Sequence, residues 1–241
     1  MSYNPGSFGR VRIFEDFLGF NTPAGNAAWA LTGVCPVGQL SMTSVGEGSL
    51  APTVDEPGGI MSITTDTTDN DNAALFAGVF KPVDGGCVME ARFKVDSATT
   101  AAIFCGFSET LALDTPDMPA EFATSSLTCN GSGSMVGMLY DPDATTDIWK
   151  AVAGDGGDEE TVYNADTAIV ADTWDVVRVE IGANGDGICY LNGKLIHTFT
   201  SFLNTSDIQH AVLMCENRDG SANVLEVDYF YAEGARDWAD D

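Results

Sequence analysis

Two carboxylates close to the C-terminus have a spacing that could support the hydrolysis of a glycosidic bond. In the segment LEVDYF, Glu226 and Asp228 lie two residues apart, and alternate residues of a β-strand face the same side. Glycoside hydrolases use such a pair, with one carboxyl as the acid and the other as nucleophile or base. The next residue on that face is Phe230 and not a third acid. We therefore interpret Glu226 and Asp228 as part of an exposed acidic face.

Other kinds of catalytic or cofactor-binding site lack their motifs. The chain has no GxSxG sequence, and its two histidines, His197 and His210, each fall in a predicted strand, where we expect them on the sheet surface. Neither GxxxxGK[ST] nor a GxGxxG that opens a helix is present. The sequence predicts no catalytic residue and no organic cofactor, and hence a protein that is not an enzyme.

Calcium is the ion that the acidic loops could bind. In DPDATTD, Asp141, Asp143 and Asp147 stand at alternating positions, and carboxylate oxygens are ligands that Ca²⁺ prefers. The segment lacks the central Gly and the terminal Glu of an EF-hand loop. The alternative is that the loop is simply solvated. The cysteines and histidines are not clustered, which argues against a transition metal.

Four tryptophans, at positions 29, 149, 174 and 238, could stack against a sugar ring if they were exposed. Trp149 lies beside the acidic loop and is the best candidate for such a platform. Trp174 begins a predicted strand, and we expect it at the rim of the core.

The charge balance excludes several partners. The 241 residues include 36 acidic and 10 basic ones, and the net charge of −26 repels nucleic acid and anionic lipid. No apolar run approaches the ~18 residues of a membrane helix, and the N-terminal sequence MSYNPGSFGRVRIF lacks a signal-peptide pattern. The six cysteines are irregularly spaced and lie mostly in apolar segments, so we expect reduced thiols and synthesis in a cytoplasm.

Period-two hydrophobicity dominates the chain, and no segment has a convincing helical stripe. The segments VMEARFKV and TWDVVRVEIG alternate clearly, and Asn192-Gly193 predicts a type I′ turn between two further strands. Other strands are expected at about 10–17, 59–65, 73–80, 101–107, 134–140, 148–153, 209–216 and 224–231. So many strands without alternating helices predict an all-β fold, an antiparallel jelly-roll sandwich of two sheets.

One domain is expected, because β-sandwiches commonly run to about 200–250 residues. We predict an N-terminal arm at residues 1–9, a jelly-roll domain at 10–231 and an acidic tail at 232–241. Residues 111–133 contain two prolines and few periodic apolar residues. They are expected to form an irregular excursion with a short helix at Pro119–Thr124.

The order of several segments resembles the concanavalin A-like lectin and glucanase superfamily, which includes laminin-G-like modules. These segments are FEDFLG, VMEARFKV, AAIFCGFSE, DTWDVVRVEIGANGDGICYLNGKLI and LEVDYFYA. The series resembles especially the jelly-roll structural proteins of tailed-bacteriophage virions, in which F-x-D-F-x-G, E-A-R-F and V-D-Y segments recur. The resemblance spans roughly residues 13–231 and implies a concanavalin A-like fold. The roles that it implies are capsid decoration or attachment, glycan binding, and glycoside hydrolysis.

Among these roles, the sequence favours a capsid decoration or cement protein on the outer virion surface, made in the host cytoplasm. Its partner would be the major capsid protein, and we expect a homo-oligomer, preferably a trimer. Contacts are predicted at Tyr3, Pro5, Phe8, Arg10 and Arg12, because an extended arm can pair with a neighbour's sheet edge. The alternative is a lectin-like carbohydrate-binding or receptor-binding module, with or without Ca²⁺. Hydrolysis ranks last, because the acidic pattern at Glu226 and Asp228 is incomplete.

Overall fold

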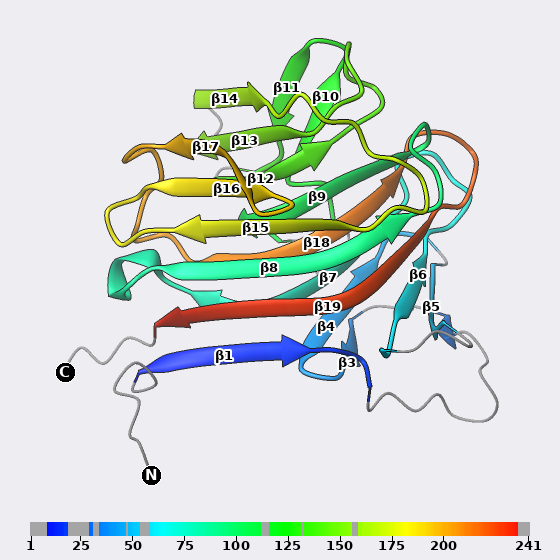
Figure 1. Ribbon diagram of the computed structural model, residues 1–241, viewed down its shortest axis with the longest axis horizontal. Coiled ribbons are helices and arrows are strands. Elements are labelled where there is room, and N and C mark those ends of the chain that lie inside the picture. The colour runs from blue at the N-terminus through cyan, green and yellow to red at the C-terminus, as the bar shows by residue number, and fades with distance from the viewer. Residues whose placement is uncertain are drawn as a thin grey trace.

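The computed structural model shows two large antiparallel β-sheets packed face to face (Figure 1). It describes residues 9–18, 29–30, 34–46, 48–53, 58–111, 116–131, 133–155 and 159–235. The predicted all-β sandwich is confirmed. Among the described residues, no helix has the length and apolar character needed to cross a membrane.

Sheet A has nine strands. Across the sheet they are β17 (Lys194–Phe199), β16 (Gly187–Leu191), β15 (Asp175–Ile181), β8 (Cys87–Val95), β19 (Val224–Ala235), β6 (Met61–Thr64), β5 (Ser49–Pro52) and β2 (Trp29–Ala30). The ninth strand, β1 (Arg10–Glu15), shares one edge of β19 with β6. β6 pairs with the N-terminal half of β19, and β1 pairs with its C-terminal half.

Sheet B has eight strands. Their order is β14 (Glu159–Asn164), β13 (Lys150–Asp155), β12 (Met135–Tyr140), β9 (Ala101–Ser108), β18 (Gln209–Asn217), β7 (Asn72–Phe80), β4 (Leu40–Ser44) and β3 (Cys35–Val37). A short 3₁₀ turn, η2 (Pro82–Asp84), connects β7 to β8. The last two strands, β18 and β19, therefore lie inside sheets B and A respectively.

The main core fills the space between the sheets, and the alternating strands point their apolar residues into it. Burial in β8 and β15 follows the predicted period of two, with Phe93 and Val177 buried and their neighbours half-buried. The Asn192-Gly193 turn is also confirmed, since φ is 51° at Asn192 and 77° at Gly193. Both signs are those of a type I′ turn, which matches the twist of β16 and β17.

In the described part of the predicted excursion, residues 116–131 contain a hairpin and no helix. Pro119–Thr124 was expected to be helical, but Ala120–Ala123 is strand β10, which pairs with β11 (Ser126–Cys129). In β10 alternate residues are buried, which is the period of a strand. The hairpin packs against the outer face of sheet B and forms a second apolar core there. This core includes Met118, Ala120, Phe122 and Leu127 from the excursion and Ala74, Phe104, Val212 and Met214 from the sheet.

Two details near the C-terminus differ from expectation. Strand β19 continues to Ala235, so residues 232–235 belong to the domain and not to the tail. A register shift between Val227 and Tyr229 places a β-bulge at Asp228. The bulge reverses the alternation, so Phe230 is buried in the core and does not share the outer face of Glu226 and Asp228.

Candidate functional site

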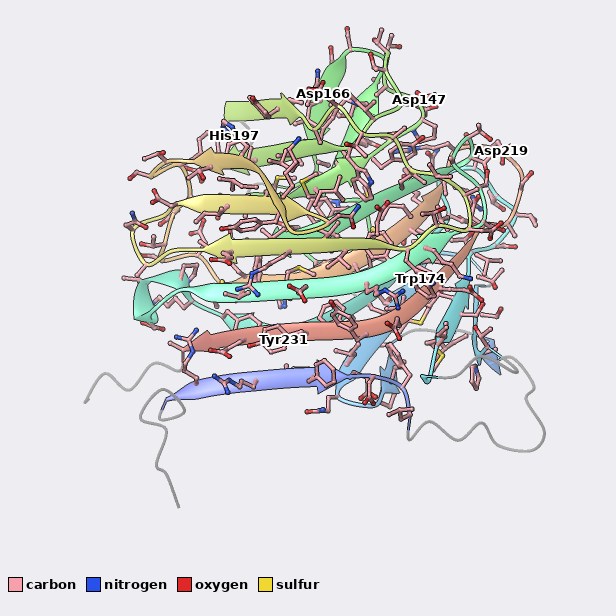
Figure 2. All side chains as sticks on the ribbon, viewed as in Figure 1. Asp147, Asp166, Trp174, His197, Asp219 and Tyr231 are labelled. Carbon is pink, nitrogen blue, oxygen red and sulfur yellow. The ribbon has the colours of Figure 1, made fainter. Side chains whose placement is uncertain are left out.

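A polar hollow of about 350 Å³ opens where loops from one end of the sandwich meet the β10–β11 hairpin. In Figure 2, Asp147 and Asp219 mark the loops that follow Asp143 and Arg218 in the chain, on the right-hand side of the view. The lining residues are Asn70, Glu121, Phe122, Ala123, Thr124, Thr128, Asp143 and Arg218. The volume is within the range of small-ligand pockets. We call it the Arg218 pocket.

Arg218 follows β18 directly, and its buried side chain holds several of the residues that line the pocket. Its side chain is only 4% exposed, and its guanidinium donates two hydrogen bonds to Asp141, from Nη2 to Oδ2 at 2.8 Å and from Nε to Oδ1 at 3.1 Å. Asp141 is fully buried and also accepts the backbone N–H of Phe122 at 2.8 Å. A bidentate, charge-assisted pair of this kind fixes both groups. Asp141 thus ties the sheet, Arg218 and the hairpin together.

A second buried carboxylate, that of Glu216 near the C-terminal end of β18, approaches the same guanidinium. Its Oε1 lies 2.8 Å from Arg218 Nη1, and its Oε2 accepts a hydrogen bond of 3.2 Å from Asn72 Nδ2. Burial raises the pKa of Glu216 to about 7, although Arg218 and Asn72 both favour the ionised form. Glu121 and Asp141, which are also negative, add to the increase.

The raised pKa of Glu216 predicts a pH dependence of stability. Between pH about 4.5 and about 7 the folded protein keeps this proton and the unfolded chain has lost it, so the free energy of unfolding falls as the pH rises through this window. The contribution is on the order of 3 kcal/mol. In Glu216→Gln it should be absent, so urea denaturation at several pH values should show a shallower decline than in the wild type. Parallel pH profiles for the two proteins would contradict this assignment.

Four side chains at the rim present polar groups toward the hollow. Asn70 uses its Oδ1 to accept from Arg218 Nη1 at 3.1 Å, which leaves its amide nitrogen for another acceptor. Glu121 lies 3.4 Å from the same nitrogen and is about one-third exposed, and Asp143 is exposed beside it. With the hydroxyl of Thr128, these groups offer both donors and acceptors within one concave site.

The three aspartates predicted to bind calcium are not brought together as a ligand set. Asp141 is paired with Arg218, Asp143 lies 3.8 Å from Arg218 Nε, and Asp147 is exposed on the loop. Within the described ranges, no three His, Cys, Asp or Glu side chains are grouped as metal ligands would be. The cation that pairs with Asp141 is the guanidinium of Arg218.

The remaining candidates for chemistry lie elsewhere. Glu226 and Asp228 form ion pairs with Lys94 at 2.6 Å and with Arg92 at 2.5 Å on the outer face of sheet A. His197 in β17 stacks on Tyr163, with ring centroids 4.4 Å apart. His210 contacts the carbonyl oxygen of Gly78 at 3.1 Å, and burial lowers its pKa. These groups share no site with the Arg218 pocket.

The predicted sugar platform at Trp149 is wrong, because this side chain is fully buried. Its ring packs against Phe93 and Tyr140, and its Nε1 donates to Asp175. Trp174 is half-buried on the outer face of sheet A, where the Arg92 guanidinium lies 4.4 Å from its ring centroid. Neither tryptophan lines the pocket.

The predicted contact residues divide into two groups. Tyr3, Pro5 and Phe8 lie outside the described residues. Arg10 and Arg12 belong to β1, and both form ion pairs with Glu233 of β19.

The sequence did not predict Arg218 or Glu121 as site residues. Arg218 contacts Asp141 and Glu121, which lie 77 and 97 residues before it in the chain. One local signal was available. The segment ENRDG ends an apolar strand with a charged pair, in a chain that has only 10 basic residues.

Comparisons with known proteins support the fold. No protein-family model matches the sequence, and no curated protein does either. Among solved structures, one of a protein of unknown function from Shewanella oneidensis MR-1 is 16% identical, with a TM-score of 0.56 over 94% of this chain and 87% of that one. The carbohydrate recognition domain of Emp46p is 10% identical, with a TM-score of 0.51 over 80% of this chain and 88% of its own.

A third structure comes from work on endo-acting O-glycanases of the human gut microbiota. It is 12% identical, with a TM-score of 0.55 over 93% of this chain and 99% of that one. These likenesses show the fold alone, an antiparallel jelly-roll sandwich like that of the Emp46p carbohydrate recognition domain. They give no support to the resemblance to virion proteins, and the capsid-decoration hypothesis stays a prediction.

Proposed function

We propose that this protein is a carbohydrate-binding module and that its ligand binds in the Arg218 pocket. The observation that carries the proposal is the set of polar groups around one hollow, held in place by the buried Arg218 and Asp141. Sugar hydroxyls are both donors and acceptors, so they suit a site that combines carboxylates, an amide and hydroxyls. The carbohydrate recognition domain of Emp46p, which has the same general fold, favours this class of ligand.

We further propose that binding is not followed by turnover. The two acids that the sequence offers for hydrolysis, Glu226 and Asp228, are neutralised by Lys94 and Arg92 on another face. Hydrolysis requires two carboxyl groups on either side of one glycosidic bond. In the pocket, Glu121 and Asp143 both approach the same Arg218 guanidinium, at 3.4 and 3.8 Å, so they are not arranged as such a pair. Incubation of the protein with any glycan that it binds should therefore release no reducing ends, and measurable release would contradict the proposal.

The test of binding is a glycan array at neutral pH, followed by calorimetry on the strongest ligand. Glu121→Gln should weaken binding at least about tenfold, equivalent to about 1.4 kcal/mol, because it replaces a rim carboxylate that accepts sugar hydroxyls. Glu226→Gln makes the same chemical change on the outer face of sheet A and should leave the affinity unchanged. EDTA should have no effect, since Arg218 supplies the cation. A blank array, or equal losses in both variants, would refute the assignment.

A further inference from the structure

The outer face of sheet A has a charge composition unlike that of the rest of the chain. Strands β1, β8, β15 and β19 direct half of all the basic residues outward, namely Arg10, Arg12, Arg92, Lys94 and Arg178. The same strands direct five acidic residues outward, namely Glu90, Glu180, Glu226, Asp228 and Glu233. We call this surface the ladder face.

The charges of the ladder face cancel. The other 31 acidic and 5 basic residues of the chain therefore carry its whole net charge of −26. A surface of such strong single sign repels another copy of itself over about 10 Å at moderate salt. The ladder face is a broad part of the described surface where this local repulsion is absent.

Ion pairs hold the charged side chains of the ladder face in fixed positions. Arg178 contacts Glu180 at 2.6 Å and Glu90 at 3.5 Å, while Arg10 and Arg12 both contact Glu233. The signs alternate between neighbouring strands, as at Arg178 beside Glu90 and Arg12 beside Glu233. Side chains that are already ordered lose little further entropy when a partner covers them.

Aromatic rings lie among these charges. Phe14 of β1 is 50% exposed and stacks on Tyr229, with ring centroids 6.0 Å apart. Trp174 supports Arg92 and Lys94 from one side, and Tyr231 donates to Glu233. Figure 2 shows Trp174 and Tyr231 on this side of the molecule. Aromatic and Arg side chains at the centre of a neutral surface are typical of protein interfaces.

We propose that two copies of this chain associate through their ladder faces. A two-fold axis brings the same patch of each copy together, and a patch with alternating signs can place the basic groups of one copy opposite the acidic groups of the other. The negative surface of each copy then points away from its partner. Four strands about 4.8 Å apart and about 25 Å long give a footprint of roughly 500 Å² per copy, the size of a weak, reversible interface.

Sedimentation equilibrium of the intact protein tests this proposal, which does not depend on glycan binding. Between about 5 and about 500 µM we expect a monomer–dimer equilibrium with a micromolar Kd. Raising NaCl from about 0.15 M to about 1 M should tighten the dimer at least about threefold, because salt screens the repulsion between the two net charges. A dimer held by local charge attraction alone would weaken instead, and that result would overturn the proposed balance of forces.

Substitutions identify the face. Phe14→Asp should weaken dimerisation at least tenfold, and Arg12→Glu should weaken it as well, because each gives the ladder face a net negative charge. Val79→Asp is the matched control, since Val79 is 64% exposed on β7 of sheet B. Circular dichroism of each variant confirms that it is folded. A wild type that stays monomeric at every concentration, or a Val79→Asp loss equal to that of Phe14→Asp, would overturn the proposal.

Discussion

Arg218→Met is expected to lower the free energy of unfolding by about 3–5 kcal/mol. The substitution removes the only cation in contact with Asp141 among the described residues, and Asp141 has no exposed surface through which water could replace it. Glu216 loses the same partner. A buried carboxylate without a counter-charge costs far more than the ion pair itself contributes. Urea denaturation followed by circular dichroism measures the difference.

Arg12→Met provides the matched control for this experiment. Arg12 also pairs with a carboxylate, Glu233, but its own side chain is 54% exposed. Exposed ion pairs contribute about 0–1 kcal/mol, so this variant should remain close to the wild type. If Arg12→Met and Arg218→Met lowered the free energy of unfolding by similar amounts, burial of the ion pairs of Arg218 would not have the energetic importance that we assign to it.

Trp149→Ala should destabilise the protein by a similar amount, about 3–5 kcal/mol. Trp149 is fully buried, and its ring contacts Phe93 at 6.1 Å and Tyr140 at 5.8 Å between centroids. Truncation leaves a large cavity between the sheets. It also removes the N–H that Asp175 accepts at 3.2 Å. Thermal or urea unfolding checks the expectation.

The comparison for this variant is Trp174→Ala, which removes the same side chain from the outside of sheet A. Its ring contributes cation–π contacts with Arg92 and Lys94, worth about 0.5–1 kcal/mol each at exposed positions. The loss should be clearly smaller than that of Trp149→Ala. The opposite order would contradict the burial of the two side chains as we describe it.

Local patterns predicted the centre of the sandwich well. Strand β8 and the Asn192-Gly193 turn obey rules that act over a few residues, so they are visible without any partner. The short strands β3, β4 and β5 were missed, since burial in β4 scarcely alternates and β3 has only three residues. Strand β10 was mistaken for a helix because Pro119 and few periodic apolar residues obscured its hairpin.

The candidate site was much less predictable. The sequence predicts Asp141 as a calcium ligand, whereas in the structure it pairs with the side chain of Arg218, 77 residues away. The bulge at Asp228, which turns Phe230 inward, also depends on pairing with β8. Both features arise from contacts between distant segments, and no single-sequence pattern records such contacts.

The position of β18 and β19 has a consequence for how the chain acquires its structure during synthesis. Strand β18 lies between β9 and β7, and β19 lies between β8 and β6, so each sheet has a C-terminal strand in its interior (Figure 1). Sheet B stays in separate parts until β18, which ends at Asn217, has been synthesised, and sheet A stays in separate parts until β19, which ends at Ala235, has been synthesised. The nascent polypeptide therefore completes its fold only after the last strand has been translated, and until then it exposes unpaired strand edges of the kind that favour aggregation.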